Sequence, residues 1–226
     1  MKLSKMMIKN HNIAMDLVHS DKNLNDDEKI FILENFQESA DHINSAHGAF
    51  FTPLDLAFDF TIEVPDSIEG LDIIDLCAGI GMLSFASRRK AKHLTCIEFN
   101  PNYIEVGKRV LPEAEWIHAD ALSYEYDRKY DFAISNPPFG NIKTGEHTGK
   151  YKGSKFEWKI AEKASEIAVN SALIIPRNSA CISSGGADLK KFMETTGIVF
   201  EDSCVLIDDY RNEWKVVNPD CVITTI

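Results

Sequence analysis

The chain has 226 residues, 44% of them hydrophobic, and a formal net charge of −11, which fits one domain with a substantial core and an appendage. Its apolar runs are far shorter than the 18 or more residues of a membrane span, and the basic start 1–9 lacks the apolar core of a signal peptide. The cysteines are odd in number and form no Cys-x-x-Cys pair, which predicts reduced thiols in a cytoplasmic protein and neither a zinc site nor a disulfide framework; they are Cys77, Cys96, Cys181, Cys204 and Cys221.

Residues 1–47 are predicted to form an N-terminal helical appendage, and residues 48–226 the main domain. Apolar residues recur at roughly helical spacing between Lys5 and Val18. Three acids at 26–28 stand in the first turn of a second helix, which is expected to run to about Ser45. We expect both helices to pack against the main domain; a cap, a lid or a dimer face is the alternative.

A short helix is predicted at 54–60, which Thr52 is expected to cap with Pro53 at the first helical position. After a linker around residues 65–66 the chain reads as alternating strands and helices. Such alternation predicts a mostly parallel Rossmann-like sheet with helices on both faces. The predicted strands are 71–76, 94–98, 116–118, 130–135, 172–176, 204–207 and 221–226, and the predicted helices between them are 82–89, 101–111, 155–169 and 189–196.

Small and acidic residues mark the carboxyl ends of the first three predicted strands. Gly79 and Gly81 follow the first strand, where glycine permits a tight turn and close approach of a ligand to the backbone. Glu98 ends the second strand 19 residues after Gly79, where a carboxylate can hold the two hydroxyls of a ribose. Asp120 follows the third strand, within reach of a nucleobase edge. Together with Asp75 at the end of the first strand, these residues predict one ligand crevice.

The fourth of these strands ends in Ser135-Asn136-Pro137-Pro138-Phe139-Gly140. Neither proline can donate a ladder hydrogen bond, so the adjacent carbonyl groups stay available as acceptors. The Asn136 side chain adds a second acceptor and Phe139 adds a flat apolar face. Two converging acceptors and a stacking ring suit a planar group that carries an NH2, such as adenine. A plain turn between strand and loop is the other interpretation of this segment.

Over about residues 48–180 the chain resembles the class I S-adenosylmethionine-dependent methyltransferases, in particular the amino-group methyltransferases marked by Asn-Pro-Pro-aromatic. The resemblance implies a seven-stranded sheet, S-adenosylmethionine as cofactor, and no metal. It places Glu98 at the ribose hydroxyls, Asp120 at the adenine amino group, and Asn136, Pro137, Pro138 and Phe139 at the substrate. The cofactor site that it implies consists of Phe51, Thr52, Pro53, Asp75, Cys77, Ala78, Gly79, Gly81, Glu98, Phe99, Asp120, Ala121 and Asn136.

The segment 49–53 carries the preference for DNA. Phe51-Thr52-Pro53 looks like the aromatic-Thr-Pro element that precedes the glycine motif in adenine-N6 DNA methyltransferases, where it closes over the methionine end of the cofactor. A capped helix start with aromatic packing is the other interpretation.

A lysine-rich segment follows the Asn-Pro-Pro-Phe motif. The net charge is unfavourable for binding nucleic acid, because phosphate contacts need positive charge, although a local patch can supply it. Lys143, Lys150 and Lys152, with further lysines up to 163 and several glycines between them, are the candidate substrate-binding residues. We expect a lid that contacts phosphates; a solvated loop is the alternative. Larger relatives carry a separate target-recognition domain, so a protein partner that supplies recognition is conceivable.

The sequence thus predicts transfer of a methyl group to adenine N6 in nucleic acid, DNA being favoured over RNA. Small ribosomal-RNA adenine methyltransferases also use Asn-Pro-Pro-Phe, protein-glutamine methyltransferases usually have Tyr where this chain has Phe139, and an idle cofactor-binding subunit is a further alternative. Direct transfer needs positioning rather than a covalent intermediate, so no catalytic cysteine is expected. The chain has no Pro-Cys dipeptide, which disfavours cytosine-C5 methylation by a thiolate.

Overall fold

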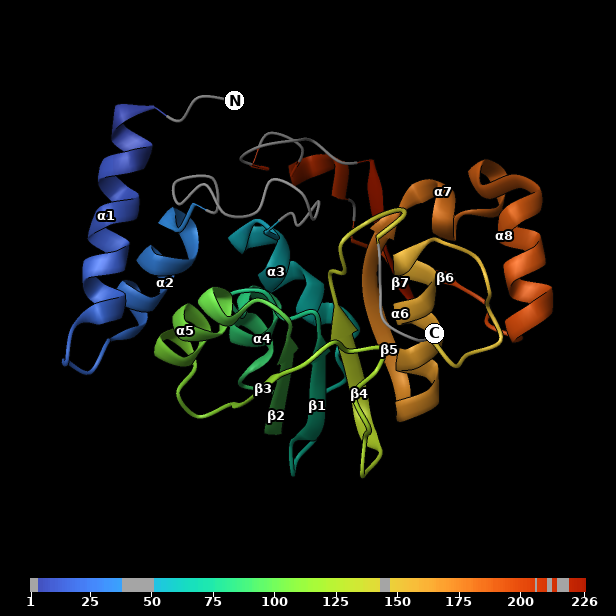
Figure 1. Cartoon of the computed structure of the whole chain (residues 1–226), viewed down its shortest axis with the longest axis horizontal. Coiled ribbons are helices and arrows are strands. Elements are labelled where there is room, and N and C mark those ends of the chain that lie inside the picture. The colour runs from blue at the N-terminus through green and yellow to red at the C-terminus, as the bar shows by residue number, and fades with distance from the viewer. Residues whose placement is uncertain (1–3, 38–50, 143–146, 206, 211–212, 215–219) are drawn as a thin grey trace.

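A computed structural model describes residues 4–37, 51–142, 147–205, 207–210, 213–214 and 220–226, without the side chains of 182 and 209. These residues form a seven-stranded sheet in the order β3-β2-β1-β4-β5-β7-β6 (Figure 1). The strands from β3 to β5 are parallel neighbours, while β7 runs antiparallel to β5 and β6. The predicted Rossmann-like sheet is therefore confirmed. The strands are β1 Leu71–Leu76, β2 Ala91–Glu98, β3 Glu115–His118, β4 Tyr130–Ser135, β5 Ala168–Pro176, β6 Glu201–Asp202 and β7 Cys221–Thr225.

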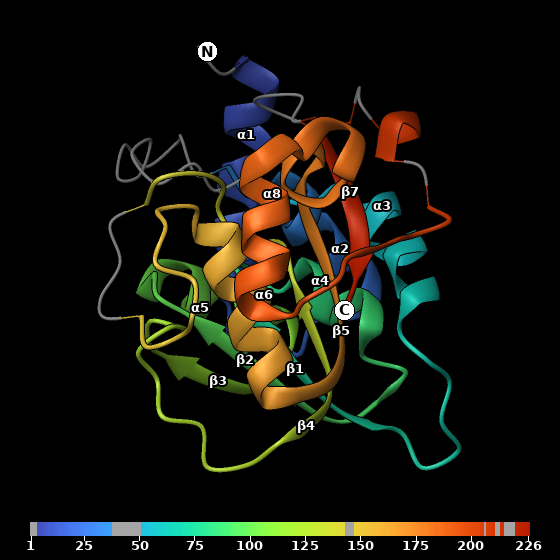
Figure 2. The same cartoon turned by 90° about the vertical axis from the view of Figure 1, so that its right-hand side faces the viewer.

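Successive residues of the central strands feed two hydrophobic cores, one on each face of the sheet. Ile73 belongs to one core and Ile74 to the other, as the alternation of side chains along a strand requires. The second core is closed by α6 (Phe156–Ile167) and α8 (Ile182–Thr196), which lie toward the viewer in Figure 2. Because both faces are covered, the central strands are nearly continuous apolar runs.

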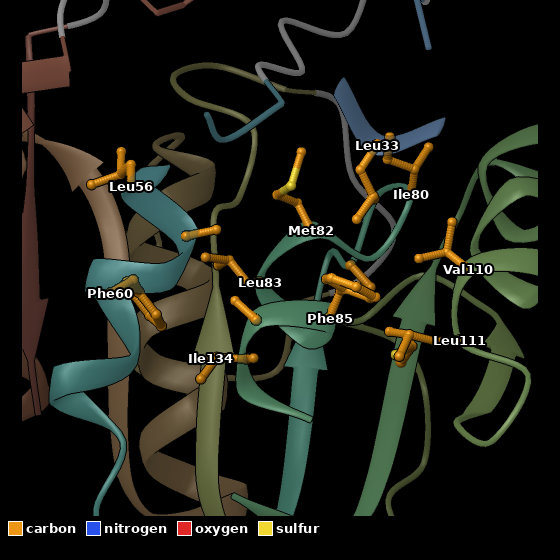
Figure 3. Packing of buried hydrophobic residues seen from close by; sticks show 14 of the residues in the cluster. Leu33, Leu56, Phe60, Ile80, Met82, Leu83, Phe85, Val110, Leu111 and Ile134 are labelled. Atoms are coloured by element: carbon orange, nitrogen blue, oxygen red, sulfur yellow. The ribbon is translucent and has the colours of Figure 1, made fainter. Parts of the chain in front are cut away.

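The first core is built by the other helices. Figure 3 shows Leu56 and Phe60 of α3, Phe85 of α4 and Leu33 of α2 converging over the sheet. All four of these side chains are almost fully buried. The helices on this side are α1 Lys5–His19, α2 Asp26–Asn35, α3 Leu54–Phe60, α4 Met82–Ser87 and α5 Pro101–Val110; the remaining short elements are η2 Thr61–Glu63, α7 Arg177–Ala180 and η3 Ile207–Tyr210.

The N-terminal helices pack against α5, as expected, at the opposite end of the molecule from α8 (Figure 1). Arg109 of α5 fixes the turn after α1 by donating to the carbonyl groups of Val18, Ser20 and Lys22 at 2.8–2.9 Å. Phe36, which follows α2, is buried against the rings of Phe51 and Tyr103. The boundary at residue 47 between the N-terminal helices and the main domain stays a prediction, since residues 38–50 lie outside the described part.

Several local expectations are wrong. The helix expected to end at 169 ends at Ile167, β5 begins at Ala168 rather than 172, and α8 begins at Ile182 rather than 189. The second N-terminal helix ends at Asn35 because the next residue, Phe36, turns to extended backbone to bury its ring. The strand expected at 204–207 is absent from the described residues: the Ser203 hydroxyl accepts from Val205 N–H at 2.9 Å and leads the chain away from the sheet, and η3 follows. The first helix of the main domain has Pro53 as its N-cap rather than at its first helical position, and Thr52 makes no cap hydrogen bond.

Candidate active site

The loop between β1 and α4 has the backbone conformation that its glycines predict. Gly79 and Gly81 have φ values of +58° and +90°, where side chains are strained, and even Cys77 has a φ of +70°. The N–H of Ala78, itself buried, bonds to the carbonyl of Ile97 at 2.9 Å and holds the loop on β2. A Cβ on Gly79 would lie 3.5 Å from the Phe51 ring, so this ring covers the loop. The predicted aromatic element and glycine motif are thus in contact.

Asp75 is buried below this loop with half of its carboxyl group unpaired. Ser84 of α4 donates to Oδ2 at 2.6 Å, while Oδ1 has no hydrogen-bond partner within the described residues. Burial raises the pKa of Asp75 to about 7, the Ser84 hydrogen bond counteracts the rise, and the charge of Glu98 adds to it. A buried acceptor with a raised pKa is poised to receive a cation or a hydrogen-bond donor from a ligand.

Glu98, the last residue of β2, bridges the loop and the start of α5. Its Oε2 accepts from Gly79 N–H at 2.8 Å and its Oε1 from Asn100 N–H at 2.7 Å. Burial raises its pKa, against the opposing effect of these backbone donors. Each carboxylate oxygen can accept a further hydrogen bond, so these contacts leave capacity for two hydroxyl groups.

Beyond β2 the same edge of the sheet carries an exposed apolar ring and a carboxyl group. Phe99 is 68% exposed, although it is large and apolar, and the carbonyl group of Phe99 contacts His118 Nε2 at 2.9 Å. Asp120, two residues after β3, accepts from Leu122 N–H at 2.9 Å through Oδ1 and starts a turn whose next residue, Ala121, is buried. The sheet order places the ends of β3, β2, β1 and β4 in a row, so all the predicted carboxylates lie along one edge.

The Asn-Pro-Pro-Phe segment leaves β4 at the same edge. The hydroxyl of Ser135 donates to the carbonyl of Leu76, which fixes the end of β4 to the end of β1. Asn136 Nδ2 donates to Oγ1 of the buried Thr52 at 3.0 Å. This bond makes Oδ1 the end of the Asn136 amide that is turned away from Thr52. Pro137 is buried, Pro138 and Phe139 are partly exposed, and the Phe139 ring packs against the first core.

The lysine-rich segment is more firmly held than a free lid. Lys143 lies outside the described residues, while Lys150 and Lys152 are exposed. The backbone N–H of Lys150 donates to the buried Glu162 of α6 at 2.5 Å, and that of Tyr151 does so at 3.1 Å. Three lysine ammonium groups of the segment have partners: Lys150 Nζ lies 3.5 Å from the Thr196 carbonyl, Lys155 lies 4.0 Å from the Trp158 ring centre, and Lys163 pairs with Glu166 at 2.8 Å.

Sequence reasoning missed three residues that support the site: Ser84, which orients Asp75, and the buried Glu157 and Glu162, which hold the segment after Phe139. Nothing in the sequence distinguishes these glutamates from solvated helix charges. In the described part of the chain, no cluster of three or more His, Cys, Asp or Glu side chains is placed to hold a metal ion, and no helix is long and apolar enough to cross a membrane.

Two solved structures share this fold. The fold matches a putative class I S-adenosylmethionine-dependent methyltransferase of Listeria monocytogenes with a TM-score of 0.63 and 14% identity, over 90% of this chain and 69% of the other. It also matches a methyltransferase subunit of a type I restriction-modification system from Streptococcus thermophilus with a TM-score of 0.61 and 14% identity, over 89% and 48% of the two chains. At such identities these likenesses concern the fold alone.

The family follows from the sequence. Residues 41–171 match the family described as "Methyltransferase small domain", and this chain therefore belongs to that family. A curated relative, tRNA1(Val) (adenine(37)-N6)-methyltransferase of Aliivibrio fischeri, is 38% identical over 77 residues. That match covers 30% of this chain and 33% of the relative, so it spans about a third of the curated protein.

S-adenosylmethionine is accordingly the cofactor of this methyltransferase, and three observations at this edge of the sheet fit its binding. A buried, unpaired Asp75 oxygen suits its ammonium group, the glycine loop admits a ligand close to the backbone, and the exposed Phe99 ring offers an apolar face to a nucleobase. Burial raises the pKa of the Cys77 thiol well above its usual range, so this cysteine is a poor nucleophile here.

Replacing Glu98 with alanine should weaken binding of S-adenosylhomocysteine, the demethylated product, by about 1–3 kcal/mol, because charged hydrogen bonds to the ligand are lost. Glu98→Gln should lose less, since it keeps an acceptor for Gly79 N–H. Isothermal titration calorimetry measures both, with the exposed Glu113→Ala as control. Wild-type affinity in Glu98→Ala would show that the ribose lies elsewhere.

Proposed function

We propose that this protein transfers the methyl group of S-adenosylmethionine to the N6 amino group of an adenine in RNA. The observation that carries the proposal is the bond between Asn136 and Thr52, which joins the Asn-Pro-Pro-Phe segment to the aromatic element over the glycine loop. The residues proposed to act on the substrate and those proposed to hold the cofactor are thereby fixed to one another.

The chemistry explains why such a segment is needed. An adenine amino nitrogen is a poor nucleophile, because its lone pair is delocalised into the ring. Hydrogen bonds from the NH2 group to Asn136 Oδ1 and to the Pro137 carbonyl favour a pyramidal nitrogen with its lone pair available. In this structure Nδ2 donates to Thr52, so Oδ1 is the end of the amide that we assign to the substrate amino group. Phe139 would stack on the base. Pro138 has no N–H that could compete with the adenine amino group for the Pro137 and Asn136 acceptors.

The cofactor supplies an electrophilic methyl group on a sulfonium centre when it is bound. We assign Asp75, Gly79 and Gly81 to its methionine and ribose part, Glu98 to the ribose hydroxyls, and Asp120 to the adenine amino group. Phe51, Thr52 and Pro53 would cover the methionine end. The backbone of Cys77, Ala78 and Ala121 and the Phe99 ring would complete the site.

RNA replaces DNA as the favoured substrate in this proposal. The expectation of DNA depended on Phe51-Thr52-Pro53, whereas the curated relative is by name a tRNA methyltransferase. The match spans only a third of that relative, so DNA stays the second candidate on the strength of the aromatic element. Phosphate contacts are assigned to Lys150 and Lys152, which are exposed, together with Lys143.

The test is methyl transfer from labelled cofactor to transfer RNA, ribosomal RNA, DNA and protein in parallel. We expect label in RNA and a steep loss of activity with salt, because lysine–phosphate contacts release counterions. The double variant Lys150→Ala/Lys152→Ala should reduce the salt slope by about one per lost contact. Lys92→Ala, an exposed lysine at the start of β2 and hence at the opposite edge of the sheet, is the control. Label confined to protein or to DNA would contradict the proposal.

A further inference from the structure

A buried carboxylate holds the end of the Asn-Pro-Pro-Phe segment. Glu157, in the first turn of α6, has only 2% of its surface exposed. Its Oε2 accepts from the N–H of Gly140, the residue directly after Phe139, at 2.8 Å. Its Oε1 accepts from the hydroxyl of Ser179 on α7 at 2.8 Å, and Ser179 is itself fully buried. Both oxygens therefore have partners from elements far apart in the sequence.

The other polar group of Gly140 is also bound. Its carbonyl accepts from Phe156 N–H at 2.9 Å and from Ile142 N–H at 3.0 Å. Gly140 has a φ of +87°, so the chain turns sharply here. The segment is thus fixed at one end by β4 and the Asn136–Thr52 bond, and at the other end by the start of α6.

We propose that Glu157 is a positioning residue for methyl transfer: through Gly140 it sets where the acceptors and ring of residues 136–139 lie. The inference rests on the proposed function. A buried charge with two charge-assisted hydrogen bonds is strongly held, and removing it leaves Gly140 N–H without its acceptor. Misplacement of reacting groups by about 1 Å can cost a hundredfold in rate. Substrate need not touch Glu157 for this effect.

The experiment compares Glu157→Ala with Glu157→Gln in the full chain. The glutamine oxygen can accept from Gly140 N–H while its NH2 donates to Ser179 Oγ, so Gln should keep the segment in place. We expect Glu157→Ala to lower kcat ten- to a hundredfold with unchanged affinity for S-adenosylhomocysteine, and Glu157→Gln to stay within about threefold of wild type. Amide exchange of Gly140, followed by NMR, should accelerate in the Ala variant alone.

Thr95→Ala is the control, since it removes a buried side chain of β2 that bonds to Glu115 and Arg128 and has no contact with residues 136–140. It should lower the melting temperature but leave kcat within about threefold. Wild-type kcat in Glu157→Ala, or equal losses in Ala and Gln, would overturn the inference. If wild-type protein methylates no substrate, the proposed function fails, and unchanged Gly140 exchange in Glu157→Ala would then overturn the positioning role separately.

Discussion

Replacing Asn136 with alanine is expected to reduce turnover at least tenfold, about 1.4 kcal/mol of activation free energy, with nearly unchanged cofactor affinity. The reason is that hydrogen bonds to the amino group improve as its nitrogen becomes pyramidal, so their loss affects the transition state more than the bound ground state. Single-turnover rates with saturating cofactor, together with calorimetric affinity for S-adenosylhomocysteine, measure the two effects separately.

Phe139→Ala provides the contrast, because it removes a stacking surface rather than an acceptor. It should raise the KM for nucleic acid by the equivalent of about 1–3 kcal/mol, the usual range for a base stacked on an aromatic ring. If Asn136→Ala turned over at the wild-type rate, residues 136–139 would be a turn and nothing more.

Affinity for S-adenosylhomocysteine is expected to rise about tenfold between pH 6 and pH 8. The Asp75 pKa of about 7 in the cofactor-free protein means that this carboxyl is mostly protonated at pH 6 and mostly ionised at pH 8. The proposed contact between Asp75 and the ammonium group of the ligand requires the ionised carboxylate, so binding should release a proton near neutral pH and strengthen as the pH rises through the pKa. Calorimetry in two buffers of different ionisation enthalpy measures this proton release directly.

Asp75→Asn keeps the shape of the side chain and cannot ionise, so it should abolish both the pH dependence and the proton release. The same raised pKa makes the cofactor-free fold less stable as the pH rises from about 4 to about 7, and the Asn variant should lack this loss. Asp72→Asn, near the start of the same strand, should behave as wild type. Persistent proton release in Asp75→Asn would assign the titration to another group.

The elements that could be predicted are those whose pattern is local. The buried runs of β1 and β4 and the proline at the start of α5 placed these elements to within a residue. The end of α2 and the region after β6 were mispredicted because tertiary contacts decide them: the burial of Phe36 among aromatic rings, and the Ser203 hydroxyl that replaces a ladder partner.

The candidate site likewise has one part that the sequence predicts and another part that depends on tertiary packing. Glycines and acids at strand ends are visible in sequence, because a strand-to-helix junction fixes where they lie. The bond between Asn136 and Thr52 spans 84 positions and links two motifs that the sequence shows only separately. The partners of Glu157 and Glu162 likewise depend on how α6 packs, and no spacing along the chain reveals them.

The most direct test of the central claim is the identity of the methylated atom. RNA incubated with the protein and S-adenosylmethionine is digested to nucleosides, which are separated and identified by mass spectrometry against standards. We expect N6-methyladenosine, formed by the wild-type protein and at least tenfold more slowly by Asn136→Ala. Methylation of cytosine, or of adenine at a ring nitrogen, would contradict the assignment of residues 136–139 as the amino-group acceptor site.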